Sequence, residues 1–117
     1  MAAKTYLDAR AVLSADDFQY ADVDCPEWGG SVRVRGLTAG ERSSVARRIK
    51  ANDQQDLEVS VVIFGTVDQN GDRLFSKNDK DQLKQKSNNV ITRIAKRILE
   101  LSGGDEDSVS EAQKNSD

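Results

Sequence analysis

The stretch between residues 87 and 103 limits the possible folds of this chain more than any other feature. Its apolar residues recur with the spacing i, i+1, i+4, i+5, i+8 and i+9, which places them in one stripe along a helix. The stripe consists of Val90, Ile91, Ile94, Ala95, Ile98, Leu99 and Leu101. Ser87 or Asn88 is suited to begin this helix, and the pair Gly103-Gly104 is suited to end it. Two uses of the stripe are open: it packs entirely in the core, or part of it is exposed for a partner.

An earlier segment follows a different period, because its apolar and polar residues alternate. Alternation over two residues is typical of strands, and we expect an antiparallel hairpin that pairs residues 18–25 with residues 30–36. The turn is predicted by Pro26, which cannot donate to a strand ladder, and by Gly29 and Gly30, which tolerate unusual backbone angles.

The predicted hairpin has an inward and an outward face. Val32 and Val34 lie on the inward face, and we expect Trp28 to fold back near the bend as a hydrophobic cap. The outward face is expected to be solvated, with opposite charges paired across the two strands. Its residues are Arg33, Arg35, Asp22 and Asp24.

Two capping-box patterns predict further helices. In such a box a hydroxyl and a carboxylate three residues apart satisfy backbone N–H groups that the helix leaves free. The pair Thr38 and Glu41 opens a helix over residues 39–51, and the pair Ser76 and Asp79 opens a polar helix over 77–86.

Residues 54–67 are open to two interpretations. Their many valines give the segment a high strand propensity. Leu57, Val61 and Phe64 also form a usable helical face. We favour a buried helix that ends near Gly65.

Two shorter segments complete the prediction. The first sixteen residues carry apolar residues at helical spacing and predict a short helix. A turn at Asn70-Gly71 is expected to deliver Leu74 and Phe75 to the core.

These elements predict an α+β fold in which a small N-terminal β-hairpin packs with three to four α-helices. We expect one domain over residues 1–103, because 117 residues are too few for two ordinary domains. Residues 104–117 hold five acids and one base and almost no large apolar residues, so we expect a disordered acidic tail.

The composition gives little support to catalysis. The chain has no His, which is the commonest general base and metal ligand, so a Ser-His or Cys-His pair cannot form. The single Cys25 is expected to be a small apolar residue at a strand end. Asp68, Asn70 and Asp72 resemble the start of a calcium loop, but the Gly falls at the fourth position instead of the sixth, which favours a plain turn. We therefore expect no enzyme, no metal and no cofactor.

Nucleic acids and membranes are also poorly supported as partners. The net charge is −3, whereas nucleic-acid-binding proteins usually carry a clear excess of Lys and Arg. The alternative, a nucleic-acid-binding regulator, would use a basic patch near Trp28. That patch would consist of Arg33, Arg35, Arg42, Arg47 and Arg48. The longest apolar stretch, residues 61–64, is far shorter than the ~20 residues that span a bilayer, so we expect a soluble protein in a reducing cytoplasm.

Three segments of the chain, in order, resemble a known family. Residues 26–42 read PEWGGSVRVRGLTAGER and resemble the VPEWGG-x-V-x-VRGL-T-x-x-ER signature of tail assembly chaperones from long-tailed (siphovirus-type) bacteriophages and prophages. Residues 67–83 resemble the D-x-x-G-x-R-L-F-(S/T)-x-x-D-x-x-x-L segment of that family. Residues 86–103 resemble its K-S-x-x-x-x-x-R-I-x-x-x-I-x-x-L-S-G helix. With the acidic ending, the resemblance covers about residues 14–117.

The resemblance implies an assembly factor that works in the cytoplasm of the bacterial host and is absent from the virion. Such chaperones bind the tape measure protein, a long and mostly helical rod, and keep it soluble until tail tube subunits polymerise around it. Family members are often also made in a longer, frameshifted form whose extension recruits the tail tube protein. This chain would correspond to the short form, with Lys114-Asn115 near the slip site. Self-association is a further expectation, since a hairpin leaves open strand edges.

A chaperone of this kind needs exposed apolar surface with a polar rim. We expect the hairpin, the exposed part of the final stripe and two basic residues that steer an acidic partner to supply this surface. The predicted partner-binding residues are Trp28, Val32, Val34, Arg47, Ile91, Ile94, Arg97 and Ile98. The alternative function is a structural tail or connector component of the virion.

Overall fold

A computed structural model describes residues 4–51 and 54–103 of the chain. The helices are α1 (Ala9–Ser14), α2 (Ala39–Lys50), α3 (Gln54–Gly65), α4 (Lys80–Leu83) and α5 (Asn88–Leu101), with short 3₁₀ helices η1 (Pro26–Trp28) and η2 (Lys77–Asp79). The strands are β1 (Tyr20–Cys25), β2 (Gly30–Arg35) and β3 (Thr66–Val67). The fold is α+β, as the sequence predicts.

The strands form one antiparallel sheet in the order β1, β2, β3. β1 and β2 are the predicted hairpin, with Val23 opposite Val32. Gly29 closes the bend in the left-handed region, at φ 83°. On its other side β2 pairs with β3, where Val34 lies opposite Thr66. The sequence analysis did not predict β3, so the sheet has one strand more than the expected hairpin.

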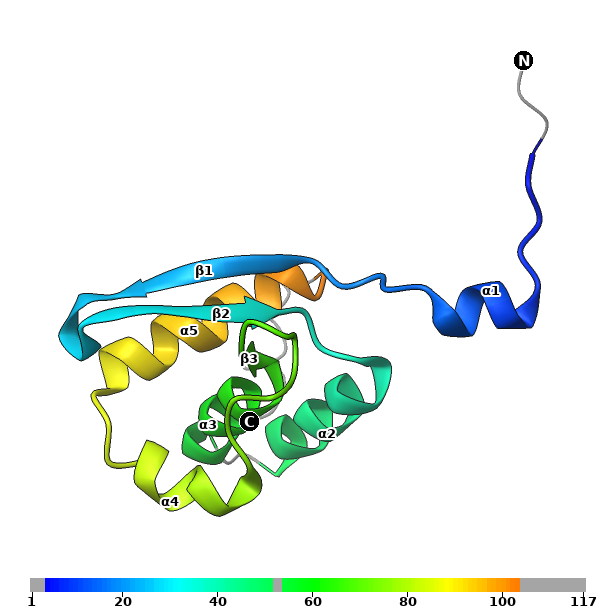
Figure 1. Ribbon diagram of the computed structural model, residues 1–117. Coiled ribbons are helices and arrows are strands. Elements are labelled where there is room, and N and C mark those ends of the chain that lie inside the picture. The colour runs from blue at the N-terminus through cyan, green and yellow to red at the C-terminus, as the bar shows by residue number, and fades with distance from the viewer. Residues whose placement is uncertain (1–3, 52–53, 104–117) are drawn as a thin grey trace.

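The helices pack on one another and on one face of the sheet. Figure 1 shows α5 running behind the two long strands, with α3 beside it and with α2 and α4 packed against α3. Most of the α5 stripe is buried: Ile94 and Ile98 have no exposed surface, and Ile91 is 4% exposed. Leu99 and Leu101 are half-buried and pack against the same core. The core interpretation of the stripe is therefore confirmed.

Two glycines allow close approach between elements. A Cβ atom at Gly65 would lie 2.5 Å from Cγ2 of Ile98, so the close approach of α3 and α5 at this point needs a residue without a side chain. A Cβ atom at Gly36 would lie 2.7 Å from the carbonyl oxygen of Leu101, which brings the end of β2 against the end of α5. The N–H group of Leu37 donates to Oγ of Ser102 at 2.8 Å at the same junction.

The ambiguous segment is a helix followed by a short strand. The favoured interpretation, a buried helix ending near Gly65, is confirmed by α3. Leu57, Val59, Val61 and Val62 are all buried, although they do not share one helical face. A helix covered on most sides carries no clear period of its own, which explains why the sequence fits both structures.

Three expectations need correction. Leu74 is 47% exposed, because it lies in the loop that returns to β3, and only Phe75 packs against the core. Arg35 is buried instead of solvated, since it forms an ion pair with Glu41. The polar helix predicted over 77–86 is reduced to η2 and the one-turn α4, although its capping box is present.

Helix α1 exists as predicted, but none of its residues is buried. Asp8 caps it by accepting a hydrogen bond from the N–H group of Ala11 at 2.8 Å. Figure 1 shows it at a distance from the other elements. The predicted disordered tail, residues 104–117, lies outside the described residues.

Candidate partner-binding surface

The described residues offer few groups for chemistry. Burial raises the pKa of the Cys25 thiol, and its Sγ contacts the carbonyl oxygen of Val23 at 3.6 Å. Within residues 4–51 and 54–103, no group of three or more His, Cys, Asp or Glu side chains could hold a metal ion. In the same part of the chain, no helix has the length and hydropathy needed to cross a lipid bilayer. The candidate site is therefore a surface, whose shape depends on three groups of charged side chains.

Glu41 is the centre of a buried charge cluster that fixes the junction between β2 and α2. Its two carboxylate oxygens accept hydrogen bonds from Arg35 at 2.9 and 3.2 Å, and one of them also contacts Arg73. The backbone N–H of Thr38 donates to the same carboxylate at 2.8 Å, which completes the predicted capping box. Burial by itself would raise the pKa of Glu41, but these donors outweigh it and lower the pKa to about 2.

A second cluster connects α2, α3 and α4 through Asp56. Its carboxylate accepts from Nε of Arg48 at 2.8 Å and contacts Lys80, and Nζ of Lys84 lies 3.8 Å away. Burial would raise the pKa of Asp56, but the hydrogen bonds from Lys80 and Arg48 lower it instead. Because three helices supply the charges, this cluster holds α4 against the body.

A third ion pair holds the hairpin tip on α5. Arg93 donates to both oxygens of Glu27, at 2.9 and 2.7 Å, and to the carbonyl oxygen of Asp24 at 3.2 Å. The hydrogen bond from Arg93 lowers the pKa of Glu27 to about 2. This bidentate pair fixes the position of η1, and therefore of Trp28, relative to α5.

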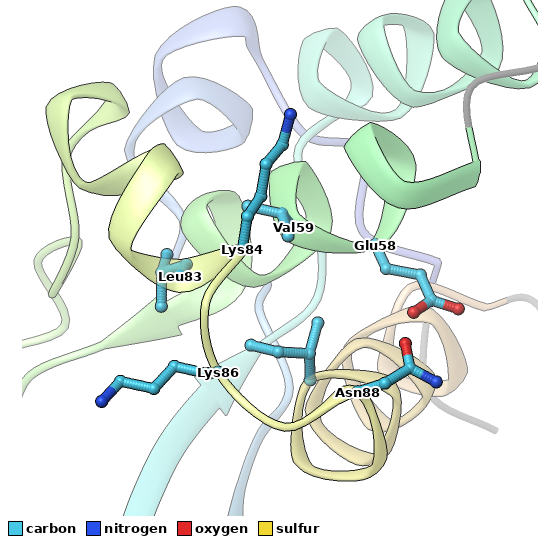
Figure 2. A pocket seen from close by; sticks show the side chains of 7 residues that line it. Glu58, Val59, Leu83, Lys84, Lys86 and Asn88 are labelled. Atoms are coloured by element: carbon cyan, nitrogen blue, oxygen red, sulfur yellow. The ribbon is translucent and has the colours of Figure 1, made fainter.

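A groove of about 430 Å³ lies between α3, α4 and α5. Figure 2 shows Glu58 and Asn88 facing each other at one end, with Lys84 and Lys86 on the other side. The apolar side chains that line the groove are almost completely buried. They are Val59, Leu83 and Ile91. The groove therefore offers mainly polar contacts and little apolar surface to a partner.

Four of the six exposed large apolar side chains in the described residues lie in the N-terminal arm, which we define as residues 4–15. Tyr6 is 85% exposed, Leu13 is 84% exposed, and Leu7 and Val12 are also exposed. The arm includes α1 and extends away from the body in Figure 1. A single helix of six residues is too short to be stable in water by itself. The arm therefore exposes apolar side chains, and its helix would be stabilised by contact with another surface.

The structure separates the eight residues that were predicted to bind a partner. Val34, Ile91, Ile94 and Ile98 lie in the core, because α5 turns its stripe toward the sheet and α3. The expectation that part of this stripe is exposed is wrong for these isoleucines. Val32 is half-buried and packs against the same core.

The remaining three predicted residues reach the surface at separate places. Trp28 lies at the hairpin tip and is 36% exposed. Arg47 lies on α2, whereas Arg97 lies on α5 and donates to Glu100 at 3.2 Å. A role for these residues in partner binding stays a prediction.

Sequence reasoning missed the N-terminal arm and the Glu41 cluster. The arm carried a signal, since Leu7, Val12 and Leu13 are apolar residues of the short helix predicted within the first sixteen residues. Arg73 joins Glu41 across 32 positions of sequence, and no local pattern indicates such a contact.

Comparisons with known proteins agree with this architecture. Residues 7–115 match the model of a family described as phage tail assembly chaperone. The structure of the bacteriophage HK97 tail assembly chaperone matches with a TM-score of 0.61 and 23% sequence identity. That match covers 72% of this chain and 85% of the HK97 chain, and at this identity it shows a shared fold. No curated protein matches the chain significantly.

Proposed function

This chain belongs to the phage tail assembly chaperone family, and from this premise we propose that it binds the tape measure protein of its phage. In this proposal the chain keeps the tape measure soluble while tail tube subunits polymerise around it, and it then leaves. The role is one of binding and release, without an enzymatic step. The protein acts in the cytoplasm of the bacterial host and is absent from the finished virion.

The exposed apolar side chains of the N-terminal arm are the observation that carries this proposal. A long helical rod presents apolar stripes to water before its tube forms, and an arm with four exposed apolar side chains can cover part of one. Those side chains are Tyr6, Leu7, Val12 and Leu13. The isoleucines of the α5 stripe do not serve this purpose, because they are already covered by the body.

The expected strength of this contact suits a chaperone that must leave. Covering each apolar side chain of the arm contributes about 1.5–3 kcal/mol. Association and ordering of the arm cost roughly 4–15 kcal/mol, which offsets most of that gain. A single copy should therefore bind weakly enough for polymerising tube subunits to displace it.

Two further parts of the proposal follow from the family. A longer form made by frameshifting would recruit the tail tube protein through its extension. Copies could also associate along the tape measure through the free edge of β1, which is an outer strand of the sheet.

Copurification tests the proposed partner. A tagged form of this chain is co-expressed with the tape measure protein of the same phage, and the tape measure should elute with it. Mass spectrometry of purified virions provides the second readout, in which the chain should be missing. A chain that does not retain the tape measure and is abundant in virions would instead be a structural tail or connector component.

A further inference from the structure

The solvent face of α2 carries an unusual group of cations. Arg42, Arg47 and Lys50 are all exposed, and with 3.6 residues per turn they lie within an arc of roughly 140°. The opposite face of the helix is directed inward by Val45 and Glu41, which are buried. We call these three cations the basic face of α2.

The basic face differs from the arginines that hold the body together, because within the described residues its three charges have no ion-pair partner and lie together on one helix. Arg35, Arg48, Arg73 and Arg93 each form an ion pair with a carboxylate. Within the described residues, Arg42, Arg47 and Lys50 form no side-chain hydrogen bond, ion pair or ring contact. Three neighbouring unpaired cations create a positive potential that attracts acidic segments.

The end of α5, which precedes the acidic residues 104–117, lies close to the start of α2. Ser102, after the last turn of α5, accepts a hydrogen bond from Leu37, which lies two residues before α2 begins. Gly36 lies against the carbonyl group of Leu101 at the same place. The last described residues of the chain therefore lie at the N-terminal end of α2.

Length and charge of residues 104–117 both fit the basic face. The twelve residues of α2 span roughly 18 Å, whereas the fourteen residues of the acidic segment can extend over roughly 46–50 Å. The acids of the segment outnumber its single base, Lys114. They are Asp105, Glu106, Asp107, Glu111 and Asp117.

We propose that residues 104–117 bind along the basic face of α2 within the same chain. The contact is electrostatic and covers Arg42, Arg47 and Lys50 until an acidic partner displaces the segment. It goes beyond the proposed function, since it needs no tape measure protein. Because the segment is covalently attached close to α2, its effective concentration at the basic face is high, and weak charge pairs suffice to hold it there.

Paramagnetic broadening in the isolated full-length chain tests this contact. A nitroxide label is attached to Ser116→Cys, and Cys25 does not compete for the label because it is fully buried. At about 50 mM salt the label should broaden the backbone amide signals of α2. The broadening should be lost at about 1 M salt, where charges are screened beyond roughly 3 Å.

Variants with reversed charges on the basic face, and a control with reversed charges elsewhere, test which cations hold the segment. The broadening should be lost when Arg42, Arg47 and Lys50 are replaced by Glu. It should persist when Glu replaces Lys77 and Lys86, two exposed cations away from α2. A second variant, with Asp105→Asn, Glu106→Gln and Asp107→Asn, should lose most of the broadening without any change in the body.

Three results would overturn the proposal. The first is broadening of α2 that is equal in the wild-type chain and in the chain with the reversed basic face. The second is broadening of α2 that is no stronger than that of α4. The third is broadening that arises between a labelled chain and a separate isotope-enriched chain, which would assign the contact to a second copy.

Discussion

Replacement of Glu41 by Gln is expected to lower the free energy of unfolding by about 3 kcal/mol at neutral pH. The carboxylate is 7% exposed and is bound by Arg35, Arg73 and the backbone N–H of Thr38. Its pKa falls from 4.5 to about 2 in the folded chain, and this difference corresponds to about 3 kcal/mol. Removal of one member of a buried ion pair typically costs about 3–5 kcal/mol, which agrees with that value.

The lowered pKa of Glu41 also determines how the effect of Glu41→Gln on the free energy of unfolding depends on pH. Because the pKa of Glu41 is lower in the folded than in the unfolded chain, its stabilisation is present above about pH 4.5. It is lost as the pH falls toward about 2. The difference in stability between the wild type and Glu41→Gln should therefore close over this range.

Urea unfolding followed by circular dichroism measures both quantities at a series of pH values. Glu100→Gln is the matched control, because Glu100 is an exposed carboxylate paired with Arg97. Its loss should change the stability by less than about 1 kcal/mol. A cost below about 1 kcal/mol for Glu41→Gln at neutral pH, or a cost that does not change with pH, would refute the reasoning.

Two further changes test how the helices are held together. Gly65→Ala should lower the unfolding free energy by about 1–3 kcal/mol, because the added Cβ would lie 2.5 Å from Ile98. In Gly40→Ala the nearest atom would be 4.0 Å away, so its melting temperature should stay or rise, and equal melting temperatures for both variants would contradict the packing argument. Asp56→Asn should speed amide hydrogen exchange in α4 because the ion pair with Lys80 is lost, and unchanged exchange rates would count against a role of this cluster in holding α4.

Local patterns predicted most of the helices and the hairpin. The stripe runs along most of α5, a helix of fourteen residues, so its period is unambiguous. The capping box of α2 needs only two residues three positions apart, and both of its hydrogen bonds are present. Such features depend on short stretches of sequence and can be recognised without the fold.

Features that depend on distant residues could not be predicted in this way. β3 is only two residues long and owes its existence to pairing with β2. The burial of Arg35 depends on Glu41 and on the ring of Phe18, whose centroid lies 4.6 Å from the guanidinium carbon. Leu74 lies in a loop whose path is set by a hydrogen bond from its own N–H to the carbonyl oxygen of Thr66. Its apolar character alone therefore wrongly predicts that it is buried.

The candidate surface was predicted less well than the fold. An apolar stripe on a helix is compatible with core packing and with partner binding, and sequence alone does not separate the two. Exposure separates them in the structure, since Ile94 and Ile98 are covered whereas Tyr6 and Leu13 are not. The partner that the family resemblance implies stays a prediction, and the resemblance does not indicate which residues would contact it.

The soluble fraction of the tape measure protein during co-expression tests the central claim most directly. Three forms of this chain are compared: the wild type, an arm variant with Ser at Tyr6, Leu7, Val12 and Leu13, and a control with Ser at Lys4 and Arg10. We expect the tape measure to stay soluble with the wild type and with the control, and to precipitate with the arm variant. A tape measure that precipitates equally with and without the wild-type chain would contradict the proposed function, and one that stays soluble with the arm variant would contradict the role of the arm.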